Sequence, residues 1–162
     1  MTCIKYKGDS RFDIEDKREF AGPLLKQLGG AMAFFNRYNA RQIKIDGSLK
    51  HEEWEDYPVV AVREALINAL IHRDYFYDSS HIYMHLYDSR LEIDNPGGLI
   101  RGMILDDLGN KAARRNRMLA DLMQRAGFIE NAGTGISRIR EALKNNNNPP
   151  VGISATNFFS VK

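Results

Sequence analysis

The segment from Val59 to Asp74, VVAVREALINALIHRD, constrains the fold of this chain more than any other stretch. Its apolar residues recur at helical spacing and cover most of the helix surface, which predicts a helix buried in the core. One narrow face carries Glu64, Asn68 and His72, each four residues from the next. A carboxylate, an amide and an imidazole therefore project in one direction from an otherwise apolar helix. We call these three residues the polar stripe.

Two interpretations of the polar stripe are open. The small residues Ala61 and Ala65 flank it and leave room for something other than protein to lie against it. Polar groups on a mostly buried helix need hydrogen-bonding partners, so a ligand is one explanation. The other is a solvated helix face, because any helix with one wet side shows the same spacing. The spacing does not separate them.

The composition limits the class of protein. A chain of 162 residues with 43% apolar residues can build the core of one globular domain. The net charge of +2, from 23 basic and 21 acidic residues, argues against a basic surface for nucleic acid spread over the fold. Cys3 is the only cysteine, which excludes an internal disulfide and favours a reducing cytoplasm. The short apolar runs and the lack of a signal pattern predict no contact with a membrane.

The order of the predicted elements follows from local pattern and from proline and glycine. Residues 1–19 are polar without a clear first element, so we interpret them as a lead-in from a preceding, missing domain, and residues 20–162 as one domain. The pattern then predicts a helix over 23–35, a short edge strand over 41–45, and a helix from 59 with Asp56 as its cap. It next predicts antiparallel strands over 81–87 and 90–94, joined at Asp88-Ser89. Short helices over 119–126 and 136–143 and a closing strand or hairpin over 153–161 complete the order.

Two glycine-rich stretches interrupt this order. Asn95-Pro-Gly-Gly-Leu99 ends a predicted strand and allows close approach of backbone or ligand. Gly133-Thr134-Gly135 precedes a predicted helix and can cradle an anion, since glycines turn N–H groups outward and the helix start is partly positive. Such a pattern more often marks a simple turn, and the Walker lysine is absent. Residues 100–116, with basic residues near their end, are interpreted as a long mobile connection.

These motifs together resemble a known family. In order, the chain offers a helix with Glu-x-x-x-Asn, a strand ending in Pro-Gly-Gly, a basic connection and Gly-Thr-Gly. This order resembles the GHKL, or Bergerat-fold, ATPases, such as gyrase B, the histidine kinases and MutL. More closely, residues 63–75, 95–99, 115–116 and 130–136 resemble the ATPase-like domain of RecG-related transcriptional regulators, which usually follows a Schlafen-type AlbA DNA-binding domain. The resemblance covers roughly residues 20–162.

The resemblance implies an α/β fold, a two-layer sandwich in which a mixed, mostly antiparallel sheet carries helices on one face. It also implies roles for single residues. Glu64 matches the carboxylate that deprotonates the attacking water, and Asn68 matches the amide that holds Mg²⁺ to the phosphates. The implied nucleotide contacts are Asn68, His72, Asn95, Gly97, Gly98, Arg114, Arg115, Gly133, Thr134 and Gly135. Here Gly97 begins the adenine loop, and the two arginines belong to a lid over the phosphates.

One position departs from the wider superfamily. The adenine loop there begins with an aspartate two residues before its glycine, and this chain has Asn95 at that place, with Asp94 one step earlier. An asparagine side chain offers both a donor and an acceptor, whereas an aspartate only accepts. Discrimination between ATP and GTP is therefore expected to be poor, unless Asp94 contacts the base instead.

We expect a domain that binds ATP with Mg²⁺ and has weak ATPase activity at most. It would be a cytoplasmic fragment of a regulator that reaches DNA only through a domain absent from this chain, with a homodimer as one possible assembly. The alternative is a degenerate interaction or dimerisation module, in which the polar stripe satisfies itself. Two other chemistries have less support: His72-Arg73-Asp74 imitates a kinase catalytic loop without its Asp-Phe-Gly partner, and His72, His81 and His85 with Asp74 could bind a metal.

Overall fold

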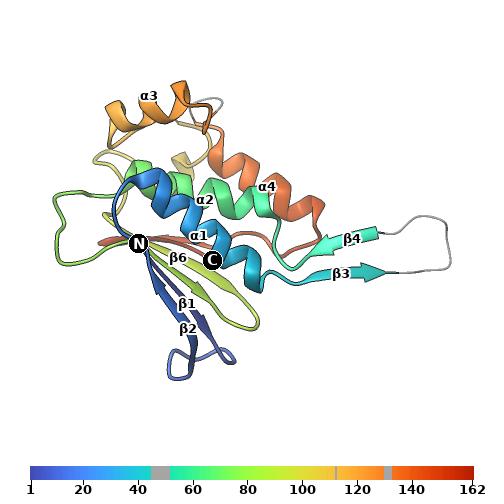
Figure 1. Ribbon diagram of the computed structural model, residues 1–162. Coiled ribbons are helices and arrows are strands. Elements are labelled where there is room, and N and C mark those ends of the chain that lie inside the picture. Colours follow the sequence, from blue (N-terminus) through green and yellow to red (C-terminus); the bar gives the residue numbers. More distant parts are fainter. Residues whose placement is uncertain (45–51, 112, 130–132) are drawn as a thin grey trace.

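The structure of the chain is a computed structural model that describes residues 1–44, 52–111, 113–129 and 133–162. Its main layer is a six-stranded sheet in the order β2-β1-β5-β6-β8-β7, with the helices on one face (Figure 1). The strands are β1 (Thr2–Tyr6), β2 (Ile14–Glu19), β5 (Tyr83–Leu86), β6 (Leu91–Pro96), β7 (Ile153–Ala155) and β8 (Phe158–Val161). β1 and β5 run parallel and the other neighbours antiparallel. The predicted two-layer α/β sandwich is confirmed.

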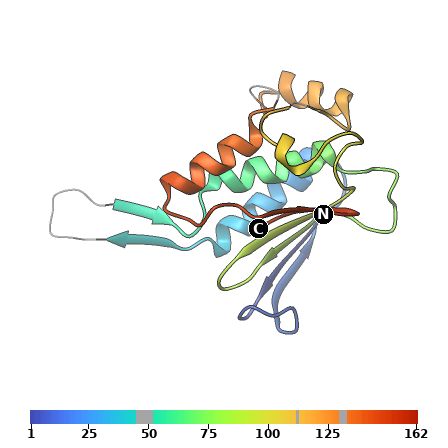
Figure 2. The same cartoon turned by 180° about the vertical axis from the view of Figure 1, so that it is seen from behind.

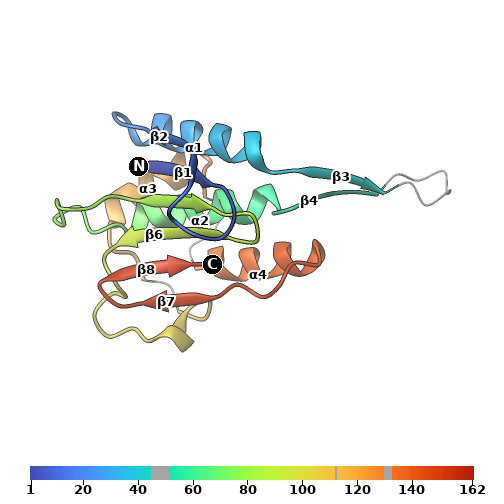
Figure 3. The same ribbon diagram turned by 90° about the horizontal axis from the view of Figure 1, so that it is seen from below.

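Four α-helices of the described residues form the second layer. They are α1 (Leu24–Tyr38), α2 (Val59–His72), α3 (Arg117–Arg125) and α4 (Gly135–Asn145), and a short 3-10 helix, η1 (Leu105–Asp107), precedes α3. Seen from the sheet side, α2 lies between α1 and α4 (Figure 3). Leu66, Ile67 and Leu70 of α2 are at most 1% exposed and belong to the same core as Met84 and Ile93 of the sheet. Each such side chain contributes about 1.5–3 kcal/mol of burial free energy, so α2 is the core helix that its apolar pattern predicts.

The first 19 residues form regular structure, although their sequence shows no clear first element. They form the hairpin of β1 and β2, and β1 pairs with β5 inside the main sheet. Cys3 is fully buried and Thr2 is 1% exposed, so β1 is covered on both faces and lacks the clean alternation that marks a half-exposed strand. Its partner β5 lies about 80 residues away in the chain, a pairing that local pattern does not reveal. The existence of a preceding domain stays a prediction.

The region before α2 also differs in part. β3 (Arg41–Lys44) is the predicted edge strand, but it pairs with β4 (Glu52–Glu55) in a separate two-stranded ribbon that projects from the body of the fold (Figure 2). Ile45, the predicted last residue of this strand, lies outside the described residues. The expected cap Asp56 does not occupy the N-cap of α2, which is Pro58, with φ of −64° and no side-chain cap. Proline suits this place because its fixed φ directs the chain into the helix.

The remaining elements follow the prediction closely. Tyr87 donates its backbone N–H to Arg90 O at 2.9 Å, which closes the expected two-residue turn between β5 and β6. Gly127, with φ of +76°, follows the end of α3, and β7 and β8 form the closing hairpin. Within the described ranges, no helix has the length and apolar character needed to cross a membrane.

Candidate functional site

A cavity of about 140 Å³ lies between α2, the end of β6, the connection before α3 and the start of α4. Ten of the residues singled out from the sequence line it: Glu64, Asn68, His72, Asn95, Gly97, Gly98, Arg114, Arg115, Gly133 and Gly135. Thr134, between the last two, is the N-cap residue of α4. Much of the remaining wall is apolar and includes Ile93, Met103 and Phe159. The fold thus gathers residues from four separate stretches of sequence around one space.

The polar stripe faces the start of α4 across this cavity. Glu64 is only 5% exposed, so the interpretation of this carboxylate as part of a solvated face is wrong. A Cβ atom placed on Gly135 would lie 2.6 Å from both Glu64 Oε1 and Asn68 Nδ2. A guanidinium nitrogen of Arg138, one turn further along α4, lies 3.9 Å from the Glu64 carboxylate. The first turn of α4 therefore rests directly on the stripe.

The start of α4 has the properties of an anion-binding element. Gly133 has φ of +88°, a conformation that glycine adopts without strain. No side-chain hydrogen bond caps this helix within the described part of the chain. Its first-turn N–H groups lack carbonyl partners inside the helix, and the helix dipole makes this end partly positive. A carboxylate such as Glu64 is stabilised here, and phosphate oxygens would be stabilised in the same way.

Two arginines of the connection stand near His72. Arg114 donates to Asp121 at 2.6 Å, and Arg115 donates to Gly98 O at 2.7 Å and lies 3.6 Å from Asp74. Burial, together with the positive charges of Arg115 and Arg114, lowers the pKa of His72 to about 4. His72 is therefore neutral near pH 7 and can act in the cavity as a hydrogen-bonding group without charge.

The two glycines after β6 are explained by packing. Gly97 has φ of +100°, and a Cβ there would come within 2.8 Å of Asp74 Cβ. Gly98 lies so close to the carbonyl oxygen of Thr156 that any side chain would collide with it. The loop is thereby clasped between the end of α2 and the turn joining β7 to β8. Close packing thus accounts for both glycines before any ligand is considered.

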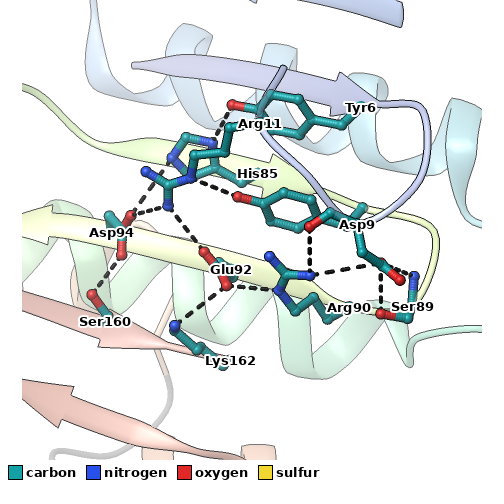
Figure 4. A network of polar contacts seen from close by, with 11 residues as sticks. Tyr6, Asp9, Arg11, His85, Ser89, Arg90, Glu92, Asp94, Ser160 and Lys162 are labelled. Carbon is teal, nitrogen blue, oxygen red and sulfur yellow. Dashed lines mark hydrogen bonds and ion pairs between the residues drawn. The ribbon is translucent and has the colours of Figure 1, made fainter. Parts of the chain in front are cut away.

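Asp94 and Asn95 lie on opposite faces of the sheet. Asn95 lines the cavity at 2% exposure, and its Oδ1 is buried with no hydrogen-bond partner in the described part of the chain. Asp94 accepts a hydrogen bond from Ser160 Oγ at 2.5 Å and lies 3.5 Å from nitrogens of His85 and Arg11 on the face away from the helices (Figure 4). Asn95, and not Asp94, is therefore the side chain available to a ligand in the cavity.

Sequence and structure comparisons relate the chain to known proteins. Residues 79–162, about half of the chain, match the HATPase_c_4 family, whose description reads "Putative ATP-dependent DNA helicase recG C-terminal". The chain belongs to the HATPase_c_4 family. The crystal structure of the DIP2311 protein from Corynebacterium diphtheriae is similar, with a TM-score of 0.85 and 26% sequence identity over 98% of this chain. This chain spans 33% of that one, and no curated protein matches it in sequence.

The family match includes some of the candidate residues and not others. It contains Asn95, the two glycines of the following loop and the start of α4, but it begins after the polar stripe. The stripe is linked to the HATPase_c_4 part of the chain by the fold, since Gly135 lies against both Glu64 and Asn68. The roles expected for the individual residues stay predictions.

One residue of this HATPase_c_4 domain has a role that the sequence did not reveal. The side-chain amide of Asn116 donates to the carbonyl oxygens of Ile71 and Arg73 at 2.7 and 2.8 Å. It thus satisfies carbonyls at the C-terminal end of α2, which otherwise lack partners. With Arg115 bound to Gly98 O, the Arg-Asn pair ties the connection to both α2 and the loop after β6. In the sequence, Arg115 and Asn116 stand out only through the resemblance to the RecG-related proteins.

The metal site suggested by three histidines is not formed. His72 lines the cavity, whereas His85 bonds to Tyr6 at 2.9 Å on the opposite face of the sheet, and His81 bonds to Thr2. Among the described residues, no group of three or more His, Cys, Asp or Glu side chains could hold a metal ion. The hypothesis of a histidine metal site is therefore wrong.

Proposed function

We propose that this HATPase_c_4 domain binds a nucleoside triphosphate, with ATP as the expected ligand, together with Mg²⁺. The observation that carries the proposal is the single cavity shared by the polar stripe, the loop after β6 and the start of α4. This combination suits the ligand: an apolar region for a base, a helix start for phosphates and hard oxygen ligands for Mg²⁺.

Each group of residues has a distinct task in this proposal. The Asn68 amide oxygen and the phosphates hold Mg²⁺, which neutralises negative charge when bound. The backbone from Gly133 to Gly135 donates N–H groups to the phosphates, and Arg114 and Arg115 close over them. Glu64 accepts a proton from an attacking water, because it is the carboxylate of the stripe. His72, kept neutral by its surroundings, donates or accepts a single hydrogen bond at the end of the stripe.

The closed form of the cavity predicts a low apparent affinity for the nucleotide. Its volume of about 140 Å³ is smaller than the roughly 300–1,000 Å³ typical of small-molecule sites. Gly135 and Arg138 also lie against Glu64, where the phosphate end of the ligand would bind. A nucleotide therefore binds only when the start of α4 or residues 100–116 move outward. The free energy of this opening lowers the apparent affinity.

The partners proposed for this domain follow from its family and its charge. We propose that it is part of a RecG-related regulator, in which another domain contacts DNA, and that two copies associate in the whole protein. The near-zero net charge supports this, since phosphate contacts by Lys and Arg supply most non-specific affinity for DNA. This chain alone should give no salt-dependent shift of duplex DNA at submillimolar concentration in a mobility assay.

Calorimetry tests the proposal directly. Titration with ATP should give a saturable binding heat. The affinity fitted from this titration should increase when Mg²⁺ is added. Residues 100–116 should be cleaved by a protease in the free protein and protected by a non-hydrolysable ATP analogue with Mg²⁺. No heat together with equal cleavage rates would favour the alternative, a degenerate interaction module in which Gly135 and Arg138 permanently cover Glu64.

A further inference from the structure

The side chain of Asn95 lies in the cavity wall, where one of its atoms lacks a hydrogen-bond partner among the described residues. It is 2% exposed, yet its Oδ1 has no partner among the described residues. Its neighbours in the cavity wall include Ile93, Phe159 and Val161, which cannot supply a donor. A buried carbonyl oxygen without a partner destabilises a folded protein. Such a group is explained when a ligand provides the missing N–H.

The carboxylate of the preceding residue, Asp94, cannot contact a ligand in the cavity. Asp94 points to the other face of β6, where Ser160, His85 and Arg11 surround it (Figure 4). Bringing Asp94 into the cavity would shift β6 by one residue and move Leu91 and Ile93 out of the core. The pairing of Asp94 with Ser160 and of Asn95 with Phe159 in the β6–β8 ladder fixes this register.

We propose that Asn95 contacts the base of the bound nucleotide and makes the site accept 6-amino and 6-oxo purines alike. This rests on the proposed function. The amide can accept a hydrogen bond from the 6-amino group of adenine and donate to a ring nitrogen. After rotation by 180° it donates to the 6-oxo group of guanine or hypoxanthine and accepts from N1–H. A carboxylate can only accept, so it would favour the 6-amino group.

The test compares the affinities of ATP, GTP and ITP in the presence of Mg²⁺ at pH 8. In the unmodified chain, the three dissociation constants should agree within about threefold. Asn95→Asp should raise the preference for ATP over GTP by about tenfold or more, since one hydrogen bond becomes a repulsion between two acceptors. Asp94→Asn is the matched control: the same chemical change in reverse, one residue away but on the opposite face, should leave the ratio unchanged.

A second variant provides a measurement that does not depend on nucleotide. Asn95→Leu replaces the amide, whose Oδ1 lacks a partner among the described residues, by an apolar side chain of similar size. It should raise the unfolding midpoint of the free protein by about 2–4 °C, while all three nucleotides lose at least about tenfold in affinity. A lowered midpoint would mean that Asn95 is a structural residue and would overturn the inference.

The outcomes distinguish this inference from the proposed function. A strong preference for ATP in the unmodified chain, unaltered by Asn95→Asp, would overturn the inference and leave the proposed function standing. Binding of none of the three nucleotides would overturn both.

Discussion

Gly135 of α4 lies directly against Glu64 of α2: a Cβ atom on this glycine would be 2.6 Å from the Glu64 carboxylate. Two helices whose contacting residues are 71 positions apart in the chain therefore touch at a point where only glycine fits. The Gly-Thr-Gly pattern can bind an anion through its backbone, but the packing explains its last glycine without any ligand. The close packing and the proposed anion contact both involve Gly135, so a substitution at this position tests the fold and the site together.

Replacing this glycine should damage both the site and the fold. Gly135→Ala forces the start of α4 away from Glu64 and Asn68, so affinity for the Mg²⁺ nucleotide should fall by about tenfold or more. The overpacking should also cost about 1–3 kcal/mol of unfolding free energy. Gly29→Ala is the control, because it lies within α1 with nothing near its Cβ position. It should stabilise the chain by about 0.5–1 kcal/mol and leave calorimetric affinity unchanged.

Substitutions of Asn68 and Glu64, the two polar residues beside Gly135, should have different effects. Asn68→Ala removes a hard oxygen ligand, so the increase in nucleotide affinity caused by Mg²⁺ should disappear. Glu64→Gln keeps the shape of the side chain but cannot accept the proton from water. Binding should persist, and any turnover should fall by about 10²-fold or more in a phosphate-release assay. Equal loss of binding in both variants would show that the stripe is a structural network.

The lowered pKa of His72 predicts a loss of stability in mild acid. Its pKa is about 4 in the folded chain and near 6.5 when unfolded, so between these values only the unfolded chain takes up the proton. Unfolding free energy should therefore fall as pH decreases from 6.5 to 4, by about 3 kcal/mol at most from this residue. Denaturant titrations of His72→Gln should show a shallower decline. The same slope in both proteins would contradict the burial of a neutral imidazole.

The lowered pKa of Glu92 predicts a second loss of stability at lower pH. Burial raises the pKa of this carboxyl group, but hydrogen bonds from Arg90, Arg11 and Lys162 outweigh it and lower the pKa to about 2 (Figure 4). Stability from this cluster is present above pH 4.5 and is lost as pH falls through 2. Since the side chain is only 4% exposed, Glu92→Gln should cost on the order of 2–3 kcal/mol at pH 7.

The location of Glu92 supplies the control for the cavity. It lies on the face of the sheet opposite the helices, so Glu92→Gln should leave nucleotide affinity within about twofold as long as the chain is folded. Asp88→Asn removes an exposed ion pair with Lys5 and should change denaturant stability little. If Glu92→Gln were as harmless as Asp88→Asn, the outer network would be a surface feature without stabilising effect.

Local pattern was sufficient for the elements that carry the chemistry. The period of apolar residues in 59–72 identified the core helix, and the same period placed Glu64, Asn68 and His72 on one face. The turn at Asp88-Ser89 and the glycine after α3 were also predictable, because each depends on a few adjacent residues. The strands of the first 19 residues were missed for two reasons. β1 is covered on both faces and gives no alternating pattern, and β2 is exposed along nearly its whole length and carries no apolar face.

The sequence by itself therefore determined which residues could serve a site and on which local elements they lie. Only the tertiary structure decided that they share one cavity, that Glu64 is covered by Gly135, and that Asn95 faces the cavity while Asp94 faces away. These relationships join segments that are dozens of residues apart. They are set by which helices pack on which face of the sheet and by the register of β6 on β8, both of which are properties of the whole core.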